Sequence, residues 1–382
     1  MIPRLELPAI DLDHCREIIG GIFDVGGRFP LRIDLRDVRR IGLLLGPDQP
    51  SPPHDLRDVI ARYLYLLAVL DQGKDSLGVH LLLSRVTNRL YEELGLPYLD
   101  EPSQFFSNLR KVIPVIEEEH GKVKAERSPF LPRITNYSLY QDQYRVTPWV
   151  AYRWGAPLGN ILRFSREGGG LLDWLNQFPS GEVAAIAIKS DPLFGLGGAI
   201  GEKASRLFVK WVVFTTRLAP AWPPNSYEVP LDANVGRVLM RTCYIFAFLD
   251  QADMTKGSIK PWTLQEDGKV NLSAQSLNDR HLSRIEEIED ELMALLERWG
   301  LGHSRSNIRL MKTLNVLLAR AKGHEAPIGQ LDDGFMAIGR DICLNTDPEC
   351  NRCPLNAICI ANQRVPELKT KFYCGTGAGV FY

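Results

Sequence analysis

The sequence lacks long apolar runs. No stretch of the 382-residue chain comes near the roughly eighteen consecutive apolar residues that a membrane-spanning helix requires. The N-terminus, MIPRLELPAIDLDHCREIIG, has acidic residues where a secretory signal peptide would have an apolar core. We therefore expect a cytoplasmic protein that is not associated with a membrane and whose thiols stay reduced.

An excess of one charge is also absent. The 45 lysines and arginines nearly balance the 46 acidic residues, which leaves a formal net charge of −1. A surface that binds nucleic acid must then be a local basic patch. The segment 302–324 is a candidate, because it contains no acid and carries Arg305, Arg309, Lys312, Arg320 and Lys322. A solvated helix face is the alternative.

Alternating apolar and polar residues are scarce, whereas helical spacing is common. The stretch RDVIARYLYLLAVL (57–70) is apolar at helical spacing, and LGVHLLLSRVTNRLYEELG (77–95) ends on a glycine that favours helix termination. We expect two further amphipathic helices at 283–300 and 306–323. EVAAIAIK (182–189) can be read as a strand, but its alanines favour a helix. The sequence predicts an all-α protein.

Cysteine is sparse, yet four of the seven cysteines lie in CLNTDPECNRCPLNAIC (343–359), with the spacing C-x6-C-x2-C-x5-C. In a reducing compartment such a cluster indicates metal ligation rather than disulfides. Structural zinc sites usually have two close cysteine pairs, and here there is one. A cubane iron–sulfur cluster accepts the asymmetry because each thiolate binds a different iron. Zinc, or four unliganded thiols, remain alternatives. The three scattered cysteines are Cys15, Cys243 and Cys374.

The cysteine spacing resembles the iron–sulfur loop of the endonuclease III-like DNA glycosylases. This resemblance implies a [4Fe-4S] cluster with a structural role. Its ligands would be Cys343, Cys350, Cys353 and Cys359.

A second feature of the same family lies upstream. The segment LFGLGGAIGEKASRLFVKW (193–211) resembles the turn and second helix of a helix-hairpin-helix motif. Gly198, Ala199 and Gly201 supply the small residues of the turn, and amides at the start of the following helix can bind a DNA phosphate. The family usually has Pro-Gly where this chain has Gly-Ala. A simple connection between two helices is the alternative.

The segment VPLDANVGRVLMRT (229–242) resembles the V-D-x-[HN]-V-x-R-V segment of the family. Asp232 matches the catalytic aspartate, and it also suits a helix N-cap. Asn234 stands where the family commonly has histidine. Arg237 and Arg241 are expected to form structural ion pairs or contact DNA phosphates.

Lys203 matches the lysine that forms a Schiff base with the sugar in the bifunctional members of the family, although a solvated surface lysine is the alternative. Lys210 is a poorer candidate because it lies farther along the helix. Gln72 occupies the place of a glutamine that fills the gap left by an extruded base, and a polar loop residue is the alternative. The aromatic residues of 144–155 are expected in the core.

The resemblance implies a base-excision-repair enzyme, a monomer that binds double-stranded DNA with a damaged or mismatched base. It would flip that base and cleave the N-glycosidic bond. Asp232 would stabilise the charge that develops on the sugar or accept a proton, and Lys203 would add AP-lyase activity. The alternatives are a glycosylase of the same fold acting on a nucleoside or RNA, a non-catalytic DNA-binding iron–sulfur protein, and a zinc-bearing scaffold protein.

The expected organisation has two domains. It comprises an N-terminal segment (1–55) that packs on the C-terminal domain, a helical domain with the helix-hairpin-helix (56–225), an iron–sulfur domain (226–365) with an insertion at 250–300, and a tail (366–382).

Overall fold

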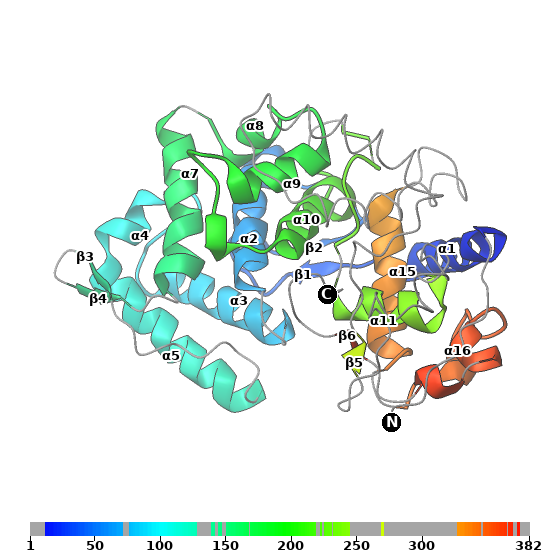
Figure 1. Cartoon of the computed structure of the whole chain (residues 1–382). Helices are drawn as coiled ribbons and strands as arrows, with labels where there is room; N and C mark the ends of the chain where they lie inside the picture. Colours follow the sequence, from blue (N-terminus) through cyan, green and yellow to red (C-terminus); the bar gives the residue numbers. More distant parts are fainter. Residues whose placement is uncertain are drawn as a thin grey trace. The chain divides into compact units, whose positions relative to one another are not determined.

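In the computed structural model most of the described residues are helical (Figure 1). The described residues are 12–71, 76–127, 139–141, 144–146, 150–167, 169–218, 222–223, 225–230, 232–244, 269–270, 327–344, 347–364, 366–369 and 373–374. Within these ranges the strands form three two-stranded sheets. None of the helices in them has the length and apolarity needed to cross a membrane.

The chain divides into two compact units. One comprises residues 1–31 and 223–382, here called the terminal unit, and the other comprises residues 32–222, here called the central unit. The sequence placed residues 32–55 with the N-terminal segment, whereas in the structure they group with the central unit. Side chains of the central unit account for this grouping, because Asn88 binds the backbone of Arg39 and Asp37, and Arg40 pairs with Asp100.

Helix α2 (Arg57–Leu70) forms the core of the central unit (Figure 1). Every residue from Val59 to Leu70 is buried except Arg62, so the helix is apolar on all sides, as expected for a helix enclosed by others. It contacts α3, α7, α8 and α10. The remaining elements of the unit are β1 (Ile33–Leu35), β2 (Leu43–Leu45), η1 (His54–Leu56), α3 (Ser76–Glu92), α4 (Ser103–Ser107), α5 (Leu109–Arg127), β3 (Leu139–Gln141), β4 (Tyr144–Val146), η2 (Ala151–Gly155), α7 (Ala156–Arg166), α8 (Leu171–Leu175), α9 (Gly181–Ser190), η3 (Gly197–Ala199), α10 (Glu202–Lys210) and η4 (Trp211–Thr215).

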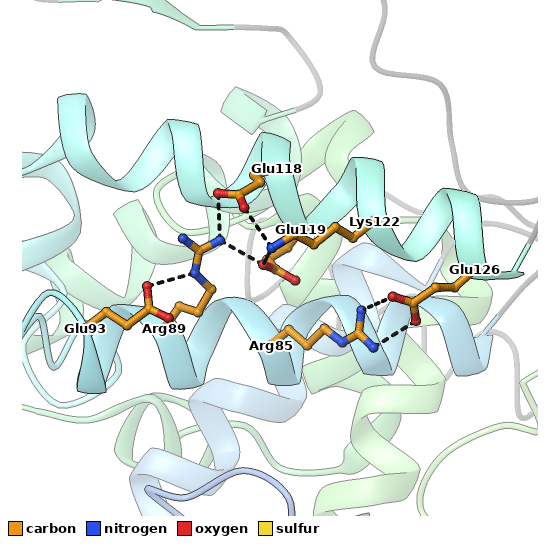
Figure 2. A network of polar contacts seen from close by, with 7 residues as sticks. All are labelled: Arg85, Arg89, Glu93, Glu118, Glu119, Lys122 and Glu126. Carbon is orange, nitrogen blue, oxygen red and sulfur yellow. Dashed lines mark hydrogen bonds and ion pairs between the residues drawn. The ribbon is translucent and has the colours of Figure 1, made fainter.

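A network of charged side chains joins α3 to α5, which run antiparallel (Figure 2). Arg85 pairs with Glu126 at 2.7 Å, and Arg89 contacts Glu118 at 2.9 Å and Glu119 at 2.8 Å. Only the Glu119 side chain is buried within this network. The exposed pairs are therefore expected to contribute about 0–1 kcal/mol each.

The terminal unit brings residues far apart in sequence into contact. Its elements are α1 (Leu12–Arg28), α11 (Ala233–Arg241), β5 (Lys269–Val270), α15 (Ile328–Asp341), η8 (Cys350–Arg352), α16 (Ile360–Gln363), η9 (Pro366–Lys369) and β6 (Tyr373–Cys374).

Helices α1 and α15 pack closely because two glycines let their backbones approach. A Cβ atom on Gly26 would lie 1.8 Å from the carbonyl oxygen of Gln330, and one on Gly334 would lie 1.9 Å from that of Ile22. Neither neighbour is a flexible side chain, so the helices would have to move apart.

We therefore expect Gly334→Ala to lower the free energy of unfolding by at least about 2 kcal/mol, because the added methyl group overpacks a backbone contact. The matched control is Gly121→Ala in α5, where a Cβ meets no atom within 4 Å. That exposed helical site is expected to gain up to about 1 kcal/mol from the better helix propensity of alanine. Denaturant unfolding of both variants measures the difference. Equal stability of Gly334→Ala and the parent chain would contradict the packing.

Candidate functional site

The central unit contains two packed helices, α9 and α10, joined by the turn of residues 191–201. Helix α9 is capped by Ser180, whose hydroxyl accepts a hydrogen bond from the amide of Val183 at 3.3 Å. At the start of the turn the carboxylate of Asp191 accepts bonds from the amides of Leu193 and Phe194, both at 2.8 Å. These local contacts set the direction of the chain as it leaves α9.

The turn has two exposed glycines followed by two buried residues. Gly197 has φ +53°, a conformation that favours glycine, and both Gly197 and Gly198 are exposed. Ala199 and Ile200 are buried and anchor the turn in the core. Gly198 has open space where a Cβ would lie, so packing does not require a glycine there. The turn thus presents an accessible backbone to solvent.

Helix α10 starts without a side-chain cap, because its N-cap residue is Gly201. The sequence placed Gly198, Ala199, Gly201 and Lys203 at this turn and helix start, and the structure brings them together there. Lys203 is the second residue of α10 and is partly exposed. Lys210, the last residue of the same helix, is fully buried.

A buried ion pair fastens α10 to α9. The guanidinium of Arg206 contacts both carboxylate oxygens of Glu182, at 2.5 and 3.2 Å, and the two side chains are 2% and 3% exposed. Arg206 also lies 3.5 Å from Glu202, which pairs with Lys189 of α9 at 3.2 Å. The orientation of the turn therefore depends on charged groups removed from water.

Asp232 caps helix α11 in the terminal unit. Its Oδ1 atom accepts hydrogen bonds from the amides of Asn234 at 2.8 Å and Val235 at 3.0 Å, and the residue is 8% exposed. The N-cap interpretation is thus confirmed, and the catalytic role of Asp232 stays a prediction.

Helix α11 binds the cysteine loop through two buried arginines. Arg237 donates to the carbonyl oxygens of Cys343 and Gly339, both at 2.5 Å, and to the amide oxygen of Asn234 at 2.8 Å. Arg241 donates from Nη1 to the Sγ atom of Cys343 at 3.3 Å and to the carbonyl oxygen of Leu344 at 2.5 Å. The predicted contact of Arg237 with DNA stays a prediction. The contact of Arg241 with a cysteine sulfur has no local sequence signal.

All four loop cysteines line one cavity of about 320 Å³, counting the part open to solvent. Arg241, Asn356, Asn362 and Lys369 also line it. The thiol of Cys359 lies 3.4 Å from the carbonyl oxygen of Arg241. Burial raises the pKa of the Cys353 thiol to about 11 and also raises the pKa of Cys359. Across the described residues, however, no group of three or more His, Cys, Asp or Glu side chains is placed to hold a metal ion. The four thiols thus line one cavity without being gathered as metal ligands.

Several predicted residues fall elsewhere. Gln72, the basic segment 302–324 and the helices expected at 283–300 and 306–323 lie outside the described residues. Lys203 belongs to the central unit and Asp232 to the terminal unit. Trp154 is fully buried, as expected for a core residue.

Comparison with models of protein families, with curated proteins and with solved structures found no match.

The buried ion pair generates a prediction about stability. Glu182→Ala leaves the guanidinium of Arg206 buried without its bidentate partner, so we expect a loss of about 3–5 kcal/mol in the free energy of unfolding. Glu126→Ala, which removes an exposed partner of Arg85, is the control and is expected to cost at most about 1 kcal/mol. Urea unfolding followed by circular dichroism compares the two. A loss in Glu182→Ala no larger than in the control would show that the pair does not stabilise the hairpin.

Proposed function

We propose that this chain is a DNA N-glycosylase that resembles endonuclease III, with a helix-hairpin-helix and a [4Fe-4S] cluster. The observation that carries the proposal is the direct bonding of the helix capped by Asp232 to the loop of four cysteines. The two sequence motifs thereby contact each other within the terminal unit. The hairpin of the central unit supplies the third motif.

The hairpin supports binding of the DNA backbone. The start of α10 carries the partial positive charge of the helix dipole, and Gly201 places no capping side chain over it. The exposed backbone at Gly197 and Gly198 allows close approach of a phosphate group. Binding at this turn is independent of base sequence, as an enzyme that surveys DNA requires.

The cysteine cavity supports an iron–sulfur cluster. Cys343, Cys350, Cys353 and Cys359 would hold it, since all four residues line one cavity and four thiolates are the donors that a cubane needs. Their sulfur atoms would have to move closer together to bind it. When bound, the cluster would link both ends of the loop by metal–sulfur bonds and so stabilise it. Arg241 would donate a hydrogen bond to one of the ligating sulfurs.

The chemistry assigned to the chain's own residues is cleavage of the bond between base and sugar. The base leaves with the bonding electron pair, and positive charge develops on the sugar. The carboxylate of Asp232 would stabilise this charge. Lys203, when unprotonated, would add to the anomeric carbon, and the proton lost from its nitrogen would pass to water. A water molecule directed by Asp232 would replace Lys203 in a monofunctional enzyme.

Asp232→Asn tests the catalytic role apart from the capping role. Asparagine caps a helix about as well as aspartate, so we expect an unchanged melting temperature. Base excision under single-turnover conditions should fall by at least about 100-fold, because the negative charge is lost. The substrates are duplexes bearing an oxidised pyrimidine, 8-oxoguanine, uracil or mismatched adenine.

Lys203→Ala should abolish covalent trapping by borohydride in a bifunctional enzyme, whereas Lys189→Ala, which removes a partly exposed lysine of the same hairpin, should not. Wild-type binding of duplex DNA without excision of any base would identify a non-catalytic DNA-binding protein. Excision from a nucleoside or RNA alone would redirect the proposal to those substrates.

Metal content tests the cofactor. Protein purified anaerobically should be brown and contain about four irons and four sulfides per chain. Cys353→Ser should lose most of this iron. Cys15→Ser, which changes a buried cysteine outside the loop, should retain it. Zinc in place of iron, or equal iron in both variants, would contradict the assignment.

A further inference from the structure

Three polar side chains of η2 and α7 donate hydrogen bonds to backbone carbonyl oxygens of the turn between α9 and α10. Arg153 donates from Nη1 to the carbonyl oxygen of Ala199 at 2.7 Å. Asn160 donates to that of Phe194 at 2.5 Å, and Arg163 donates to that of Leu193 at 2.7 Å. We call Arg153, Asn160 and Arg163 the brace. Their spacing of seven and three residues is typical of one helical face.

Arg153 differs from the other two because it makes a second contact. Its Nη1 atom also donates to the carbonyl oxygen of Val69 at 3.1 Å. Val69 lies in the last turn of α2, at the negative end of the helix dipole. One guanidinium thus joins the end of α2 to the turn before α10.

The surroundings of the Arg153 guanidinium favour a positive charge. Burial lowers the pKa of its guanidinium, but an arginine stays charged at neutral pH. The two carbonyl oxygens and the negative helix end offset part of the cost of burying that charge. A π-helical turn, the conformation of residues 151–155, often occurs at functional positions.

The brace also changes the electrostatic potential of the turn. Three carbonyl oxygens that would otherwise contribute negative potential are bonded to donors, and two of those donors are cations. The exposed backbone at Gly197 and Gly198 is therefore less negative than a turn without such donors. A phosphate group approaching the turn meets less repulsion.

We propose that Arg153 is a positioning residue for DNA binding, which fixes the phosphate-binding turn to the end of α2. This proposal rests on the proposed function and adds a residue to it. The turn would grip the DNA backbone, and Arg153 would hold that turn in place against the end of α2. Arg153 itself touches neither base nor sugar.

A double-mutant cycle with Gly198→Asp tests the proposal. Aspartate fits at position 198 because a Cβ meets no atom there, and its charge repels a phosphate. Binding to a short undamaged duplex is measured at several salt concentrations in four proteins: the parent, Arg153→Met, Gly198→Asp and the double variant. We expect each single variant to weaken DNA binding about tenfold relative to the parent. Relative to Gly198→Asp alone, the double variant should bind DNA less than about twofold more weakly, because both changes act on the same turn.

Two further variants, Arg153→Lys and Arg57→Met, are measured for comparison. Lysine keeps the charge and reaches the carbonyls with poorer geometry. The DNA affinity of Arg153→Lys should therefore fall between those of the parent and of Arg153→Met. Arg153→Lys also serves as the test variant if Arg153→Met does not fold. Arg57 likewise links α2 to a distant carbonyl, that of Leu218, at 3.0 Å. Arg57→Met should leave DNA affinity unchanged.

Two outcomes would overturn the positioning role. One is an equal effect of Arg153→Met with and without Gly198→Asp, and the other is an equal loss of affinity in Arg57→Met. Failure of the proposed function gives a different result, because Gly198→Asp then has no effect on DNA affinity and the phosphate grip itself is absent.

Discussion

Each α-helix leaves about four amides at its start and four carbonyls at its end without an intrahelical partner, and buried groups of this kind must find one elsewhere. The candidate functional residues of this chain lie where that requirement is met. Asp232 accepts the amides that begin α11, and Arg237 binds a carbonyl in the last turn of α15. Arg153 binds a carbonyl in the last turn of α2. Helix α10 begins at a glycine, without a side-chain cap. The start of α10 therefore differs from that of α11, where a carboxylate already binds the first amides.

In this arrangement, side chains that would take part in function also hold the fold together. The carboxylate of Asp232 holds the start of α11, so any charge that it lends to chemistry comes from a group fixed by two backbone amides. Such fixed groups stabilise developing charge without first having to reorganise. The arginines of α11 extend the same rigidity to the cysteine loop, through the backbone and sulfur of Cys343. A cluster bound in the cavity would strengthen an arrangement that hydrogen bonds already define.

Local patterns in the sequence predicted the local structure. The helix expected at 57–70 is Arg57–Leu70, and the next ends close to Gly95, whose φ of +63° explains the stop. The alanines of 182–189 lie in a helix, as their propensity favours. The turn after it forms where its small residues indicated. Contacts between a side chain and a distant backbone carbonyl follow no periodic pattern in the sequence. The sequence therefore did not predict the link from Arg153 to Ala199. It also did not predict that residues 32–55 group with the central unit.

The near-zero net charge limits how this chain could bind DNA. A formal charge of −1 gives no general attraction to a polyanion, so affinity would depend on a few well-placed groups rather than on a broad positive field. Well-placed groups are effective only if their geometry is fixed, because a mobile turn loses entropy on binding. The buried pair of Glu182 and Arg206 holds α10 against α9, and the brace holds the intervening segment. In a nearly neutral protein this rigidity would take the place of charge. Backbone amides that the fold has already ordered would bind a phosphate more tightly than mobile ones.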